Sequence, residues 1–259
     1  MTYYLCIIGD ILKEKKKPFL FRIVAGTIRI FYRKRTYWGL ENLPDEPSII
    51  ISNHCKSHGP IANQLFFPTD KKIWCIGQMM DRKESVDYMF QDFWSNKPKC
   101  VHWLYKIIAH IMAPLMSYLM RNADTIAVYK DSRIITTFKH TVEELTNGNH
   151  IIIFPENSTP YNGLLNDFQD KYIDIAKLYY KKYGKLLNFV PMYNCPDLKK
   201  LVLGKPIQFN PDIDMAEQRL IINDYLKNEI TKIAKDLPRH KVYPYANIRK
   251  KHYPMSKDE

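Results

Sequence analysis

Short runs of β-branched residues alternate along the chain with longer segments in which apolar residues recur every three or four positions. The first pattern predicts strands and the second predicts helices. We expect strands at 48–52, 71–77, 125–129, 150–156 and 186–193, and a strand pair or one bent strand at 201–209. Helices are expected at 18–35, 85–94, 101–120, 131–147, 167–183 and 212–235. Strands separated by helices indicate the α/β class, here a single mixed sheet flanked by helices.

Polar residues follow two of these predicted strands. Asn53 and His54 come after SIIIS, and Glu156 comes after HIIIFP. Open α/β sheets place their sites at the carboxyl ends of strands, so we expect His54 and Glu156 to face one pocket. A histidine there could take a proton from a hydroxyl group. A purely structural histidine is the alternative interpretation.

Two segments have the character of membrane-surface helices. Residues 18–35 place Arg22, Arg29 and Arg33 on one helical face, opposite large apolar side chains. The uncharged run from Ile107 to Met120 is shorter than the ~20 residues that a transmembrane helix needs. We expect residues 12–35 and 101–120 to bind the headgroup region of an anionic bilayer. Ordinary surface helices that cover the core are the alternative.

The formal net charge of +12 points to a polyanionic partner: nucleic acid, an anionic membrane or phosphorylated substrates. A generically basic soluble protein is the bland alternative. No nucleic-acid-binding motif accompanies the charge, so no nucleic-acid partner is expected. The five cysteines form no CxxC pair, which indicates a reducing, cytoplasmic setting. The first residues lack the positive start of a signal peptide.

Four blocks then occur in a recognisable order: SNHCKSHGP, TIAVYK, IIIFPENS and FVPMY, followed by LGKPI. Across residues 36–210 this order resembles the glycerolipid acyltransferase family typified by 1-acylglycerol-3-phosphate acyltransferases. That family shows Asn-His-x4-Asp, an aliphatic strand ending in Arg, Phe-Pro-Glu-Gly-Thr-Arg, and Val-Pro. The resemblance implies one acyltransferase domain over residues 1–259: a membrane-associating helical region (1–35), a catalytic core (36–210), and a C-terminal helix and tail (211–259). We expect the last ~20 residues to be loosely packed.

The resemblance implies transfer of an acyl group from a coenzyme A or acyl-carrier-protein thioester to the hydroxyl of a lysophospholipid or related lipid. His54 would be the general base, without an acyl-enzyme, and Glu156 would bind or position the acceptor. Pro155 and Pro191 would shape the site walls. The other substrate-binding residues implied are Asn53, Ser57, His58, Lys130, Asn157 and Ser158. No metal or redox cofactor is expected, because the thioester is already activated.

These features describe a peripheral membrane protein of phospholipid biosynthesis on the cytoplasmic side. Its expected partners are the anionic membrane surface, the acyl thioester and the lipid acceptor, with acyl carrier protein as an alternative carrier of the donor.

The chain departs from the family pattern at three positions. Gly59 stands where the family has the Asp that orients the histidine. Ser57 or His58 could replace it, as could a carboxylate from elsewhere, for which Asp92 and Asp170 are guesses. Lys130 and Thr159 stand where the family has arginines, so bidentate phosphate contacts are missing and the acceptor stays open.

A non-catalytic lipid-binding protein on a degenerate acyltransferase fold is therefore the rival hypothesis. Two other sites are disfavoured. A zinc cluster of His54, Cys55 and His58 lacks a second ligand group at suitable spacing. Cys55 as a nucleophile is disfavoured because neighbours on an extended strand point apart.

Overall fold

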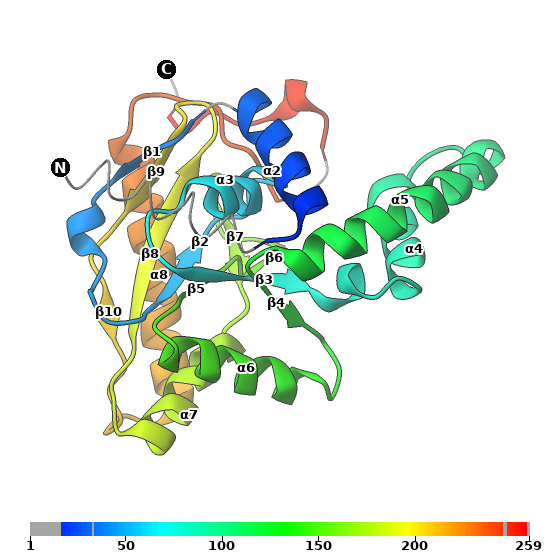
Figure 1. Cartoon of the computed structure of the whole chain (residues 1–259). Helices are drawn as coiled ribbons and strands as arrows, with labels where there is room; N and C mark the ends of the chain where they lie inside the picture. Colours follow the sequence, from blue (N-terminus) through cyan, green and yellow to red (C-terminus); the bar gives the residue numbers. More distant parts are fainter. Residues whose placement is uncertain (1–16, 33, 246–247, 258–259) are drawn as a thin grey trace. The chain divides into compact units, whose positions relative to one another are not determined.

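The computed structural model describes residues 17–32, 34–245 and 248–257 (Figure 1). The chain divides into two compact units. The smaller unit comprises Met1–Tyr32 and Ile73–His140, and the larger comprises Arg33–Lys72 and Thr141–Glu259. The single acyltransferase domain expected over residues 1–259 stays a prediction.

The larger unit contains a mixed sheet. Its strands are β1 (Thr36–Trp38), β2 (Ile49–Ser52), β5 (His150–Ile153), β8 (Asn188–Cys195), β9 (Lys200–Leu203) and β10 (Ile207–Gln208). They run in the order β1-β9-β8-β2-β5, with β10 antiparallel to β8. Strand β2 is parallel to both β8 and β5, and only β8–β9 along this order is antiparallel. The carboxyl ends of β2, β5 and β8 therefore meet at one edge.

Strands β2 and β5 are buried along their whole length. Their runs of three isoleucines suit this position, because central parallel strands are apolar on both faces. Helix α8 (Met215–Asp236) packs against β8 and buries one stripe: Ile222, Leu226, Ile230 and Ala234. Asp214 caps α8 by accepting a hydrogen bond from the Ala216 N–H.

The larger unit also contains shorter elements. Helix α3 (His58–Phe66) follows β2, and α7 (Asp174–Tyr183) follows the 3₁₀ turn η5 (Lys171–Ile173). Strands β6 (Glu156–Pro160) and β7 (Asn166–Phe168) form a separate antiparallel pair. Two more 3₁₀ turns are η1 (Leu40–Asn42) and η6 (Lys250–His252).

The smaller unit is mainly helical around the parallel pair of β3 (Lys71–Ile76) and β4 (Thr125–Val128). Its helices are α2 (Phe19–Phe31), η2 (Gly77–Met80), α4 (Glu84–Met89), the π-helix η3 (Phe90–Trp94), η4 (Lys99–Val101) and α5 (His102–Asn122). Helix α6 (Ile134–Thr146) begins in this unit and ends in the larger one. Met79, Met89 and Ala113 form a buried hydrophobic cluster in the smaller unit. No helix among the described residues is long and apolar enough to span a membrane.

The predicted α/β fold with a mixed sheet flanked by helices is confirmed, and the sheet proves to be mostly parallel. Each predicted strand exists near its expected bounds, and 201–209 is a strand pair, β9 and β10. Sequence patterns missed β1, α3 and the β6–β7 pair. The helix expected over 167–183 begins only at Asp174, because residues up to Phe168 pair with β6. The basic helix ends at Phe31, and Arg33 and residues 12–16 lie outside the described residues.

The expectation of a loosely packed C-terminal end is wrong. We call residues 238–257, of which 246–247 are not described, the C-terminal strap. His240, Tyr253 and Ser256 are buried in it. Lys241 and Met255 form an antiparallel bridge that brings the two ends of the strap together.

Candidate active site

The chain turns sharply after β2, directly beyond His54. Cys55 and Lys56 both have positive φ, 47° and 57°. Two successive residues in the left-handed region reverse the chain within a short distance. Helix α3 then begins at His58. His54 therefore stands at the carboxyl edge of the sheet, at the start of a tight loop.

Glu156, the first residue of β6, binds this loop. Its Oε2 accepts a hydrogen bond of 2.7 Å from the backbone N–H of His54, and its Oε1 accepts one of 3.2 Å from the Asn166 N–H. Burial raises the pKa of the Glu156 carboxyl, although these two hydrogen bonds act in the opposite direction. The structure thus brings His54 and Glu156 together as expected. The carboxylate holds the His54 backbone, and its role toward an acceptor stays a prediction.

Two aromatic rings contact the imidazole of His54. The Phe154 ring, directly after β5, is 5.2 Å away between centroids, and the Tyr245 ring is 5.8 Å away. Both contacts are edge-to-face, at interplanar angles of 63° and 80°. Sequence reasoning missed both residues. Phe154 stood inside a quoted motif, but Tyr245 lies far along the chain and nothing in the sequence links it to His54.

Asn53 connects the end of β2 to β8. Its Oδ1 accepts from the Asn194 N–H at 2.6 Å, and its Nδ2 donates to the Asn194 carbonyl at 3.0 Å. The same Nδ2 lies 3.0 Å from the Cys55 Sγ. The Asn53 side chain is almost fully buried, and its hydrogen bonds hold the loop after β2 against β8.

Cys55 is a poor candidate for a nucleophile. Burial raises the pKa of its thiol well above the usual range, and the Glu156 charge raises it further. The thiol therefore stays protonated at neutral pH, and the thiolate is the reactive form.

The larger unit holds every other predicted site residue except Lys130. His58 is the first residue of α3, and its ring packs on Tyr243. The pKa of His58 is lowered mainly by burial and then by the positive charge of Arg35. Ser57 and Ser158 are exposed, whereas Pro155 and Pro191 are buried. Asn157 accepts a hydrogen bond from the Thr159 N–H. Lys130 follows β4 in the smaller unit, where its side chain is exposed.

Gly59 stands where a side chain would be crowded. A Cβ at this position would lie 2.6 Å from the His54 carbonyl oxygen, 2.8 Å from the Phe154 Cε1 and 3.2 Å from the Asn194 Nδ2. The φ of Gly59 is not positive, so an unusual backbone conformation is not what favours glycine here. Neighbouring atoms already occupy the space into which the family's Asp side chain would project.

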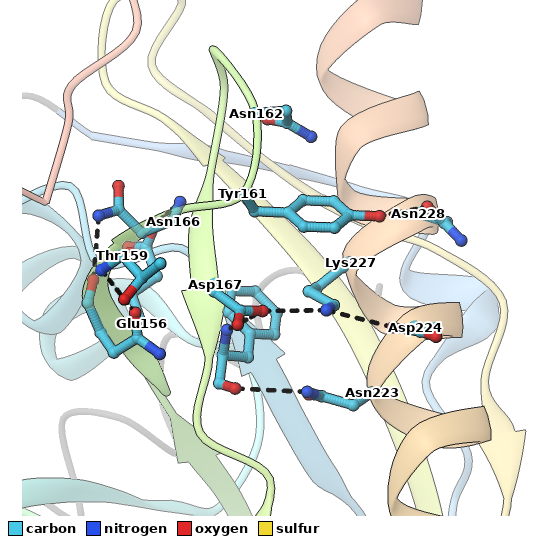
Figure 2. A network of polar contacts seen from close by, with 12 residues as sticks. Glu156, Thr159, Tyr161, Asn162, Asn166, Asp167, Asn223, Asp224, Lys227 and Asn228 are labelled. Carbon is cyan, nitrogen blue, oxygen red and sulfur yellow. Dashed lines mark hydrogen bonds and ion pairs between the residues drawn. The ribbon is translucent and has the colours of Figure 1, made fainter.

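The β6–β7 pair, which begins with Glu156, is fastened to α8 (Figure 2). The Lys227 Nζ lies 2.9 Å from the Asp167 Oδ1 and 3.1 Å from the Asp224 Oδ1, and 4.5 Å from the centre of the Tyr161 ring. The Tyr161 hydroxyl donates to the Asn228 Oδ1. Helix α8 thus supports the strand that carries Glu156.

Within the described residues there is no group of three or more His, Cys, Asp or Glu side chains arranged to hold a metal ion.

No protein-family model matches this chain, and no curated protein sequence matches it. Among solved structures it is similar to the 1-acyl-sn-glycerophosphate (LPA) acyltransferase PlsC from Thermotoga maritima, with 15% identity, a TM-score of 0.47 and 88% of each chain covered. At this level the likeness concerns the path of the backbone.

Proposed function

We propose that this protein is an O-acyltransferase that moves an acyl group from a thioester donor to the hydroxyl of a lysophospholipid or related lipid, with His54 as general base. The observation that carries the proposal is the 2.7 Å hydrogen bond between the His54 N–H and Glu156, residues 102 positions apart in the sequence. It joins the two motif blocks that the family resemblance singles out. The blocks are thus neighbours at one sheet edge, where α/β proteins place their sites.

The proposed chemistry needs one base and an activated donor. The neutral imidazole of His54 removes the proton of the acceptor hydroxyl while its oxygen attacks the thioester carbonyl. The tetrahedral intermediate collapses and the C–S bond breaks. The sulfur takes the proton that His54 had accepted and leaves as a free thiol, which returns His54 to its neutral form. Glu156 keeps the His54 backbone in place throughout, and no covalent enzyme intermediate forms.

We further propose that an anionic lipid bilayer is the partner of helix α5. Its exposed face is apolar over more than three turns, through Trp103, Leu104, Ile107, Ile111, Met112 and Leu115. Ile111 is 72% exposed and Trp103 65%. Between Asp92 and Asp124 the chain has no acidic residue, but it has Lys97, Lys99, Lys106 and Arg121. An apolar stripe with only basic charges nearby suits an anionic membrane surface.

Helix α2 has a similar composition. Phe19, Ile30 and Phe31 are exposed, and Arg22 and Arg29 lie in the same helix. Lipid acceptors reside in bilayers, so a membrane-bound enzyme would meet its acceptor in two dimensions. These surfaces therefore support a lipid rather than a soluble acceptor.

The proposal is tested with purified protein, a panel of lysophospholipids and acyl-CoA or acyl-carrier-protein thioesters, with mass spectrometry of the products. We expect acyl transfer by the wild type and a loss of about 10²- to 10⁴-fold in His54→Ala, because that is the usual contribution of a general base. His140→Ala, on the exposed side of α6, is the matched control and should keep wild-type rates.

Circular dichroism should show that both variants are folded. Wild-type rates from folded His54→Ala would exclude His54 as the base. Binding of lysolipid by a wild type that transfers no acyl group to any acceptor would favour the non-catalytic rival.

A further inference from the structure

The C-terminal strap is fastened at its base to β8 and to the turn that follows. The Tyr193 hydroxyl donates to the His240 Nε2 at 2.8 Å, while the His240 Nδ1 donates to the Pro238 carbonyl. The Lys241 N–H donates to the Asp197 carboxylate at 2.9 Å. Tyr193 and His240 are both almost fully buried. The base of the strap is therefore part of the packed larger unit.

The far part of the strap lies against the loop that carries His54. The Tyr243 ring is 5.2 Å from the His58 ring, and the Tyr253 ring is 5.2 Å from Tyr243. The Lys56 ammonium lies 4.9 Å from the centre of the Tyr253 ring and donates to the Ile248 carbonyl. The left-handed turn at Cys55 and Lys56 thus places the Lys56 side chain against the strap.

From this position the strap brings Tyr245 to the imidazole of His54, which Phe154 also contacts. Aromatic rings favour edge-to-face contacts at centroid separations of about 4.5–7 Å, and both contacts of His54 fall in this range. Two such contacts from separate elements restrain the orientation of a ring. Gly59 offers no carboxylate for this task, and the space beside it is filled.

We propose that Tyr245 is a positioning residue for His54: its ring and that of Phe154 hold the imidazole in the orientation that a carboxylate maintains in other histidine-base sites. The catalytic consequence rests on the acyl transfer proposed above, whereas the restraint on the His54 ring does not. Tyr245 is then part of the site. Without the Tyr245 ring, His54 is still present but its imidazole is no longer held in the productive orientation. Small misplacements of a reacting group lower the reaction rate strongly.

The kinetic test compares Tyr245→Ala, Tyr245→Leu and Tyr245→Phe. We expect kcat to fall about 10- to 10²-fold in the Ala and Leu variants with little change in KM, and to be restored in Phe, which keeps the ring. The Leu variant keeps apolar bulk, so the strap stays packed. Tyr180→Ala is the matched control, because Tyr180 is 36% exposed against 40% for Tyr245 and lies on α7. Wild-type kcat in both Ala and Leu variants, or a change confined to KM, would overturn the proposal.

A second measurement needs no activity. The ring proton signals of His54, assigned by their loss in His54→Ala, are recorded by NMR. We expect them to shift in Tyr245→Leu and not in Tyr180→Ala, because one neighbouring ring current is removed. Unchanged His54 signals in Tyr245→Leu would refute the contact. Should the wild type transfer no acyl group at all, the proposed function fails, and the NMR result alone decides whether Tyr245 restrains His54.

Discussion

Because Gly59 has no side chain, other residues can pack closely against the loop that carries His54. The Phe154 ring and the Asn194 amide lie where a larger residue at position 59 would project. The loop that carries His54 is contacted by Phe154, by Asn194 of β8 and by the strap. An Asp at this position would disturb those contacts before it could orient the histidine.

We therefore expect Gly59→Asp to lower both stability and turnover, and not to raise activity. A Cβ 2.6 Å from a backbone oxygen requires the chain to move, and overpacking typically costs about 1–3 kcal/mol. Urea unfolding and the acyl-transfer assay measure the two effects. Gly163→Asp is the control, because no atom lies within 4 Å of a Cβ there. A large gain in activity from Gly59→Asp would instead show that the native site lacks an orienting group.

Glu156 should leave a mark on the pH dependence of stability. Its pKa is raised in the folded protein, mainly by burial. Below the ordinary Glu value both states are protonated, and the contribution of Glu156 to stability is complete. As pH rises through the folded pKa, the unfolded state has already released its proton, so stability is lost.

Glu156→Gln, which resembles the protonated form, should remove this loss. We expect the difference in unfolding free energy between wild type and Glu156→Gln to move in favour of Gln as pH rises from roughly 4 to 8. Urea titrations across that range measure it, with the exposed Glu217→Gln as control. A difference that is constant with pH would show that Glu156 has an ordinary pKa.

At the scale of elements, the support of the β6–β7 pair by α8 can be separated from the chemistry. The Lys227 side chain is 9% exposed and pairs with two carboxylates. Burial lowers its pKa but the Asp167 and Asp224 hydrogen bonds outweigh this, so the group stays charged. Lys227→Met should destabilise the protein by about 1–3 kcal/mol, because hydrogen bonds between charged groups are lost.

Lys232→Met is the matched control, since Lys232 is on the same helix, is 67% exposed and reaches Glu229 only at 3.9 Å. Its unfolding free energy should change by less than about 0.5 kcal/mol. Asp167→Asn should add little once Lys227 is replaced, because the two residues share one interaction. Equal effects of Lys227→Met and Lys232→Met would mean that the buried pair contributes nothing.

Elements were predictable from sequence where periodicity was strong and local. The isoleucine runs of β2 and β5 could be assigned, and with them the placement of His54 and Glu156 at one edge. Helix α3 was hidden because its first residues, His58-Gly59-Pro60, look like a loop. Strand β7 was read as helix because pairing with β6 outweighs local preference. Tyr245 could not be predicted from the sequence. Its contact with His54 depends on how the strap packs, and 190 residues of chain separate the two.

At the scale of the whole molecule, the charge of +12 and the α5 stripe together predict how the protein reaches its substrate. Ile111→Asp combined with Leu115→Asp should lower binding to phosphatidylcholine–phosphatidylglycerol vesicles by at least about tenfold. Burying each of these side chains in lipid is worth about 1.5–3 kcal/mol, and 1.4 kcal/mol is a factor of ten. Added salt should weaken wild-type binding, because basic residues near the surface are screened.

Leu220→Asp is the control, since Leu220 is 65% exposed on α8 and is not part of the stripe. Sedimentation that ignores both anionic lipid content and salt would exclude the membrane partner. A dimer that dissociates in the α5 double variant, with no vesicle binding by the wild type, would assign the stripe to a second copy of the chain.

The central place of β2 in the sheet of the larger unit has a consequence for synthesis on the ribosome. Its two neighbours, β5 and β8, lie about 100 and 140 residues later in the chain. At about 5–20 residues per second, the isoleucine strand waits several seconds with both edges unpaired. Bare apolar strand edges invite pairing with other chains. We therefore expect chaperones to bind the nascent chain during this interval. A chain released before residue 188 should aggregate and not fold.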